Sequence, residues 1–143
     1  MKNGQAMKVD LLLDTHAWIW LVTGESRILK SEFGKVLLKQ ENVGFFLSSI
    51  SLWEIAMLIS KERLKLTMDT RLWLERFLKI THTSIIEIDP NIAVKSTGLD
   101  GFHGDPADRI IVATAILKKV KLVTADQSIL KYCKSNKIEY IKI

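Results

Sequence analysis

The sequence predicts an α/β fold, a three-layer α/β/α sandwich with a central, mainly parallel sheet of about five strands. Short branched-apolar runs alternate with segments of helical periodicity along the whole chain. Such alternation is typical of strand–helix–strand units, whose helices cover both faces of a parallel sheet. A hydrophobic content of 48%, with only 7 Gly and 2 Pro among 143 residues, fits one compact domain. We expect that domain to span residues 7–143 and residues 1–6 to form a flexible extension.

Five apolar runs bounded by turns or helix caps predict the strands. In chain order they are Val9–Leu13, Phe45–Ser48, Ile85–Ile88, Lys121–Thr124 and Glu139–Ile143. The intervening apolar residues recur at helical spacing and predict the helices. These are His16–Val22, Leu29–Gln40, Leu52–Ser60, Thr70–Ile80, Ile92–Ser96, Pro106–Lys118 and Ser128–Lys134.

Four acidic residues fall where this arrangement would bring them to one edge of the sheet. Asp14 ends the first strand, and Glu54 lies in the first turn of the helix after the second. Asp108 opens the helix that leads into the fourth strand, which Asp126 ends. In a parallel sheet the carboxyl ends of the strands and the amino ends of the following helices share the edge where ligands bind. We therefore expect the four carboxylates to lie close together.

Each acid also has a purely structural interpretation. Asp14 and Asp126 precede predicted helices and suit helix N-caps, while Ser51-Leu52-Trp53-Glu54 fits an S-x-x-E capping box. Taken singly, the capping interpretation is the simpler one for each. Capping does not, however, require acids from distant parts of the chain to converge, so their common placement favours a shared site.

The stretch GDPADRIIVATA, residues 104–115, places two acids at the start of one predicted helix. Asp105 suits the N-cap, since Pro106 is favoured at the first helical position. Asp108 then falls where a capping-box acid belongs, but such an acid contributes only about 0.3–1 kcal/mol through the helix dipole. Asp108 is therefore free to serve another purpose.

Carboxylates that share a partly buried rim repel one another, and a divalent cation relieves this repulsion. Oxygen ligands suit Mg²⁺ or Mn²⁺, whereas His16, His82 and His103 are too dispersed in the sequence to predict a zinc site. The chain carries a formal charge of +5. Setting the four acids aside leaves 12 acidic groups against 21 basic ones. An acidic metal site inside a basic surface suits hydrolysis of a phosphodiester.

Four segments together resemble the PIN-domain ribonucleases, specifically the VapC-type toxins of toxin–antitoxin pairs. The segments are LLLDTHAWIW, SSISLWEIAML, HGDPADRIIVATA and LVTADQSI, in family order and at family-like spacing. The resemblance covers nearly all of residues 9–143 and implies a PIN-like sandwich. It assigns catalysis and metal binding to Asp14, Glu54, Asp108 and Asp126.

The resemblance also suggests supporting residues. Thr124 would support the acids through its hydroxyl group, and Asp105 would cap the helix while lying close enough to reach the site through water. Arg109 would either bind phosphate or pair with a carboxylate. His16 and His103 flank the proposed site and are candidates to touch RNA.

The function implied by the resemblance is an endoribonuclease that uses Mg²⁺ or Mn²⁺ and metal-activated water to cleave RNA. The alternative is a non-catalytic PIN-like module that binds RNA or protein. A phosphatase with a D-x-D-x-T motif is disfavoured, because His16 stands where the second Asp would be required.

The segment Ser51–Ile80 carries more large apolar side chains than two helices usually bury against one sheet face. Most are expected to close a small core, and a remainder would form a partner-binding surface. Trp53, Met57 and Trp73 are the candidates for that surface. The resemblance implies a small VapB-type antitoxin as the partner, together with a homodimer.

The amino-terminal segment has a basic start and an apolar middle, but Asp10, Asp14 and His16 interrupt it. It therefore fails as a signal peptide or a membrane span, and we expect a cytoplasmic protein without a membrane partner. Cys133, the single cysteine, cannot form an internal disulfide and is expected to have no catalytic role.

Overall fold

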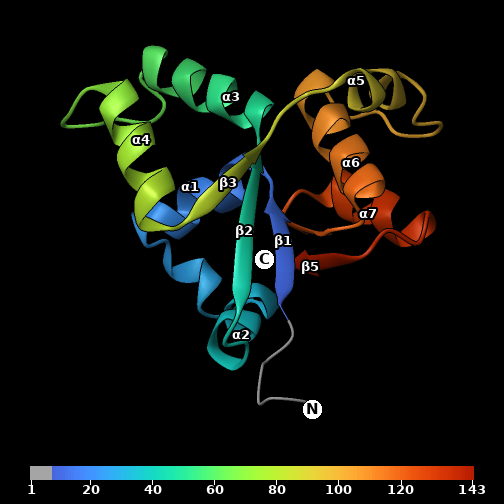
Figure 1. Ribbon diagram of the computed structural model, residues 1–143, viewed down its shortest axis with the longest axis horizontal. Helices are drawn as coiled ribbons and strands as arrows, with labels where there is room; N and C mark the ends of the chain where they lie inside the picture. Colours follow the sequence, from blue (N-terminus) through green and yellow to red (C-terminus); the bar gives the residue numbers. More distant parts are fainter. Residues whose placement is uncertain (1–7) are drawn as a thin grey trace.

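The computed structural model describes residues 8–143, so the extension expected at residues 1–6 lies outside the described residues. Five strands form one sheet in the order β3-β2-β1-β4-β5, and every neighbouring pair is parallel (Figure 1). Their bounds are β1 Val9–Leu13, β2 Val43–Ser48, β3 Thr83–Ile86, β4 Lys121–Thr124 and β5 Tyr140–Lys142. The α/β class and the five-stranded parallel sheet predicted from the sequence are confirmed.

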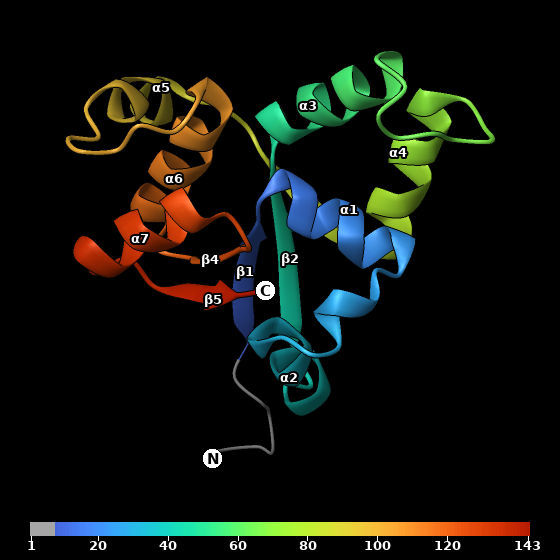
Figure 2. The same cartoon turned by 180° about the vertical axis from the view of Figure 1, so that it is seen from behind.

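Helices cover both faces of this sheet (Figures 1 and 2). The first layer comprises α1 (Thr15–Thr23), a 3₁₀ helix η2 (Ser26–Ile28), α2 (Glu32–Lys39), α3 (Ser49–Ser60) and α4 (Thr70–Ile80). The second layer comprises α5 (Pro90–Thr97), α6 (Pro106–Lys118) and α7 (Gln127–Ser135). Within the described chain, no helix is both long and apolar enough to span a bilayer.

The alternation of side chains along β1 divides the interior into two cores. Leu11 and Leu13 point into the core beneath α1 to α4, whereas Leu12 points into the core beneath α5 to α7. All three side chains are fully buried. A strand that is apolar on both faces must be covered on both faces, which is why the run VDLLL forms the centre of the sheet.

Two predicted helix starts were wrong because serine caps lie elsewhere. Ser48 accepts a hydrogen bond from the N–H of Ile50, so α3 begins at Ser49 rather than at Leu52. Ser31 accepts one from the N–H of Gly34 and starts α2 at Glu32. The predicted helix Leu29–Gln40 is therefore preceded by a separate turn of 3₁₀ helix. Strand β3 begins two residues earlier than predicted, at Thr83.

The sheet order creates a cleft between β1 and β4. The chain leaves β1 into α1 on one face, but it leaves the adjacent strand β4 into α7 on the opposite face. The two following helices diverge, and a crevice opens beyond the carboxyl ends of both strands. This is the edge at which the sequence places the four acids.

Candidate functional site

A pocket of about 310 Å³ lies at this edge of the sheet. All four acids expected at the site line it, although they come from four separate segments of the chain. The lining residues are Asp14, Thr15, His16, Trp20, Arg27, Glu54, Asp105, Asp108, Ala125 and Asp126. The structure therefore brings together the acids that the sequence distributes over more than one hundred positions.

Asp14 forms the floor of the pocket, where β1 ends. Its N–H donates to the Val123 carbonyl at 3.0 Å and so joins the end of β1 to β4. One carboxylate oxygen accepts a hydrogen bond from the N–H of Ala17 at 2.9 Å, and the other accepts one from the Thr124 hydroxyl. Asp14 is only 7% exposed, and burial raises its pKa despite these two hydrogen bonds.

Glu54 lies in the second turn of α3, not the first, because the helix begins at Ser49. The predicted capping box is therefore wrong: Ser51 lies inside the helix, and its Oγ is 2.8 Å from Oγ1 of Thr15. The Thr15 hydroxyl also donates to the Glu54 carboxylate. Burial raises the pKa of Glu54. With no capping role left, Glu54 is explained best by its position on the pocket wall.

Asp105 and Asp108 divide their tasks at the start of α6. Asp105 caps the helix by accepting a hydrogen bond from the N–H of Asp108 at 2.8 Å, and it also lines the pocket. Asp108 makes no cap. Burial, together with the charges of the surrounding carboxylates, raises the pKa of Asp108 to about 7. The repulsion comes from Asp105, Asp126, Glu54 and Asp14.

Asp126 occupies the more open wall of the pocket. Its carboxylate caps α7 by accepting hydrogen bonds from the N–H of Ile129 at 3.0 Å and the Ser128 hydroxyl at 2.6 Å. Burial opposes ionisation of Asp126, but these hydrogen bonds outweigh it and lower the pKa. The Thr124 hydroxyl accepts a hydrogen bond from the Asp126 N–H at 3.0 Å while donating to Asp14. Thr124 thus links the two acids at the ends of β1 and β4.

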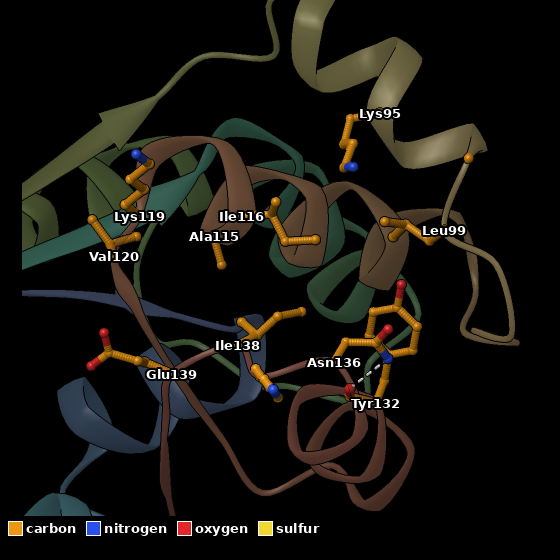
Figure 3. A pocket seen from close by; sticks show the side chains of 12 residues that line it. Lys95, Leu99, Ala115, Ile116, Lys119, Val120, Tyr132, Asn136, Ile138 and Glu139 are labelled. Atoms are coloured by element: carbon orange, nitrogen blue, oxygen red, sulfur yellow. Dashed lines mark hydrogen bonds between the residues drawn. The ribbon is translucent and has the colours of Figure 1, made fainter.

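The chemistry of the pocket, more than its size, marks it as the candidate site. A larger pocket of about 470 Å³ opens at the opposite edge of the sheet, where α6 and α7 end (Figure 3). Its walls are mainly apolar side chains and lysines, and Glu139 is the one carboxylate that lines it in the described chain. In Figure 3 Leu99, Ile116 and Ile138 surround its interior. Such a pocket lacks the grouped acids needed for metal-assisted hydrolysis.

Residues 11–135 match the family model of the PIN domain. The chain belongs to the PIN-domain family. It is 32% identical over 118 residues to Ribonuclease VapC22 of Mycobacterium tuberculosis, a match that covers 82% of this chain and 87% of that protein. The resemblance stated from the four sequence motifs is thereby confirmed.

Solved structures show the same fold. VapBC2 from Rickettsia felis bound to a promoter DNA fragment has a chain with a TM-score of 0.68 at 20% identity, covering 94% of this PIN domain and 98% of that chain. A chain of a toxin-antitoxin complex from Klebsiella pneumoniae matches with a TM-score of 0.56 at 25% identity. This match covers 81% of this PIN domain and 86% of that chain.

The donor atoms of the pocket in this PIN domain fit a hard divalent cation. Asp14, Glu54, Asp108 and Asp126 offer carboxylate oxygens, and the raised pKa of Asp108 marks the place where added positive charge relieves most repulsion. Within residues 8–143, no three such side chains are already gathered as a metal cluster. The acids line a pocket instead of meeting at a point, which suits Mg²⁺, since that ion usually keeps several of its waters.

Two expectations for individual side chains were wrong. Arg109 neither faces the pocket nor pairs with a carboxylate: its guanidinium donates to the carbonyls of Ser96 at 2.9 Å and Phe102 at 2.6 Å. It therefore braces the loop between α5 and α6. Trp73 is only 7% exposed and belongs to the core beneath α1, so it offers no surface to a partner. Trp53 is 57% exposed, as a partner-binding side chain requires, while Met57 is half-buried.

The sequence-based interpretation missed several lining residues. Thr15 was overlooked because its hydroxyl group acquires a purpose only when α1 and α3 pack together and bring it to Ser51 and Glu54. Trp20 ends the motif LLLDTHAWIW but was given no role, and Arg27 lies outside every motif used above. The spacing of His16 and Trp20, four residues apart on one helix, is the only sequence signal that would have extended the site in their direction.

Proposed function

We propose that this PIN domain is a metal-dependent endoribonuclease that uses Mg²⁺ or Mn²⁺, and that it is the toxin of a toxin–antitoxin pair. One observation carries the proposal: carboxylates from four segments line a single pocket at the switch point of the sheet. The relative at 32% identity is named as a VapC ribonuclease, which supports RNA as the substrate.

The four acids would hold the metal and orient the reacting groups. When bound, Mg²⁺ or Mn²⁺ supplies an activated water and stabilises the charge that develops on the phosphate. Hydrogen bonds from Thr124 and the Ala17 N–H fix the Asp14 carboxylate, and Thr15 holds that of Glu54. No side-chain hydrogen bond fixes the Asp108 carboxylate within residues 8–143. It would gain most from a cation, because burial and four neighbouring carboxylates oppose its ionisation.

The charge distribution supports a polyanionic substrate. The chain carries 21 basic and 16 acidic residues, and several of the acids are gathered in the pocket. The remaining surface is therefore more basic than the total charge suggests. Such a surface attracts RNA through its phosphates without reading its sequence.

The exposed face of α3 is the proposed contact for an antitoxin. Trp53 is 57% exposed beside the half-buried Met57, and large exposed apolar side chains of this kind often mark protein interfaces. The Klebsiella pneumoniae structure, a toxin-antitoxin complex at 25% identity, supports a small VapB-type partner. A homodimer is proposed together with this complex.

The competing hypothesis is a PIN domain that binds RNA or protein without cleaving. Cleavage of mixed oligoribonucleotides in Mg²⁺ or Mn²⁺ separates the two functions. We expect strand scission that EDTA stops and that Asp108→Asn lacks. Absence of cleavage by the folded, antitoxin-free protein on structured and single-stranded RNA alike would overturn the enzymatic proposal. Sequencing RNA 5′ ends after induced expression would then identify the substrate of an active enzyme.

A further inference from the structure

One permanently charged cation lines the acidic pocket. Arg27 belongs to the short helix η2, and the adjoining Ile28 is only 6% exposed and anchors this helix in the core. Among the lining residues that belong to the described part of the chain, residues 8–143, Arg27 is the only lysine or arginine. A guanidinium beside five carboxylates would ordinarily be expected to pair with one of them.

Arg27 is held by an aromatic ring instead. Its Cζ lies 4.3 Å from the centre of the Trp20 ring, a distance typical of a cation–π contact. No hydrogen bond or ion pair joins Arg27 to a carboxylate anywhere in residues 8–143. The edges of the guanidinium therefore retain their N–H donors for a ligand, while its face is fixed on the indole.

The chain turn between these two residues creates the contact. Gly24 adopts a φ of 75°, a left-handed conformation that ends α1, and its N–H donates to the Trp20 carbonyl. The N–H of Glu25 donates to the same carbonyl at 2.9 Å. These two hydrogen bonds return the chain over Trp20 and place Arg27 above the ring. The turn thus brings Arg27 close to Trp20, and the contact with the indole ring positions its guanidinium.

We propose that Arg27, positioned by Trp20, binds an RNA phosphate next to the one that is cleaved; this inference rests on the proposed nuclease function. A metal held by the acids would offset their charge at the reacting phosphate, whereas neighbouring phosphates would still face the remaining carboxylates. A guanidinium with free donors binds phosphate through two parallel hydrogen bonds. Because Arg27 already covers Trp20, the indole serves to position Arg27 and is not a stacking platform for a base.

The test measures RNA binding separately from cleavage. In an Asp108→Asn background with Mg²⁺, the affinity of a fluorescent pool of random single-stranded 12-mers is followed by anisotropy over a range of salt concentrations. Arg27→Ala should weaken binding roughly 10- to 100-fold, the loss of a charge-assisted hydrogen-bonded contact. The slope of log affinity against log salt should fall by about 0.7, the value for one phosphate contact on a single strand.

Companion variants separate binding from a general effect on charge or folding. Arg27→Lys should recover only part of the affinity, because an ammonium lacks the planar fork. Trp20→Phe keeps an aromatic face and should bind better than Trp20→Ala. Arg76→Ala removes the same charge from α4, away from the pocket, and should leave the salt slope unchanged. Circular dichroism melts confirm that each variant is folded.

The outcomes distinguish this inference from the proposed function. If the wild-type protein cleaves RNA while Arg27→Ala binds it with unchanged affinity and salt slope, the phosphate contact is wrong and the nuclease assignment stands. If the wild-type protein neither cleaves nor binds RNA, the proposed function fails and this inference fails with it. A reduced slope in Arg27→Ala, absent from Arg76→Ala, supports the contact.

Discussion

Helix α1 serves two regions of opposite character, the acidic pocket at its amino end and an aromatic core along its inner face. In the core, the fully buried Trp18 meets Trp73 edge to face at 5.9 Å, and Trp73 in turn contacts Phe77 at 5.1 Å. The Trp18 indole N–H donates to the Thr83 hydroxyl at 3.1 Å. Apolar area leaves water here and the buried polar group has a partner, so this region stabilises the fold.

In the pocket, burial and mutual repulsion oppose the ionised carboxylates, as the raised pKa values of Asp14, Glu54 and Asp108 indicate. Helix α1 therefore stabilises the fold with its interior face, while its amino end contributes to the acidic pocket. Loss of charge in the pocket should therefore impair function without unfolding the chain. Loss of an aromatic ring from the core should instead lower the free energy of unfolding.

The largest expected effect is on catalysis. Asp14→Asn or Asp108→Asn should lower the rate of RNA cleavage by about 10³-fold or more, since metal assistance contributes several kcal/mol to such reactions. The fold should persist, because Asn has nearly the volume of Asp and leaves no cavity. Initial rates in Mg²⁺ with matched circular dichroism spectra provide the measurement. Full activity in both variants would contradict the site.

Asp105→Asn is the matched control for this comparison. Asn caps helices as well as Asp does, so α6 should keep its start and most of the activity should remain. An Asp105→Asn enzyme as inactive as Asp108→Asn would show that both carboxylates are needed for catalysis.

The next effect concerns stability. Trp73→Ala should lower the free energy of unfolding by about 3–5 kcal/mol, as is usual when a large aromatic side chain is removed from a core. Trp53→Ala should change it by less than about 1 kcal/mol, because Trp53 is 57% exposed. Urea denaturation gives both values. Equal losses of unfolding free energy in the two variants would contradict the exposed position of Trp53 on α3.

Metal binding should have a smaller effect on stability. At a concentration one hundred times its Kd, Mg²⁺ or Mn²⁺ should stabilise the folded state by about 2.7 kcal/mol and raise Tm by several degrees. Glu54→Gln should reduce this gain, because it removes one oxygen anion from the pocket wall. Thermal melts in EDTA and in each metal test the expectation. A Tm insensitive to both metals at millimolar concentration would argue against the site.

The last expected effect is the pH dependence of the stability of the metal-free protein. Asp108 ionises with a pKa of about 7 in the folded state, against 3.8 in an unperturbed chain. Between these values the folded state holds a proton that the unfolded state has released, so stability should fall as pH rises from about 4 to 7 and then level off. Denaturation in EDTA should show a shallower decline for Asp108→Asn. If Asp108→Asn shows the same decline in stability, the pH dependence comes from other titratable side chains.

Local patterns were sufficient to predict the framework. The apolar run VDLLL could be predicted as a strand because a short apolar run bounded by turn or cap residues is a local signal. Its place at the centre of the sheet came from the structure. The four acids could be placed at one edge because every parallel strand ends on the same side. Asp105 was assigned as a cap, and capping was the alternative interpretation for Asp14 and Asp126. All three accept the backbone hydrogen bond expected of a cap.

Competing local signals limited the prediction of boundaries. The segment SSISLWE contains three serines, each a plausible cap, and the backbone selects Ser48 because β2 ends there in an extended conformation. This choice moves Ser51 and Glu54 into the helix and leaves them free to meet Thr15. No spacing rule within the segment identifies which of the three serines caps α3. The cap depends on where β2 stops pairing with the neighbouring strand β1.

The parallel α/β framework and the edge at which its acids gather could be predicted from the sequence, since both follow from short-range periodicity and chain direction. The folded structure was needed to show that Trp73 lies buried against Trp18, that Arg109 braces a loop, and that Arg27 lies over Trp20 beside the acids. Each of these depends on how separate elements pack. The sequence gives the charge and size of each side chain. Its contacts depend on which elements pack together and remove it from water.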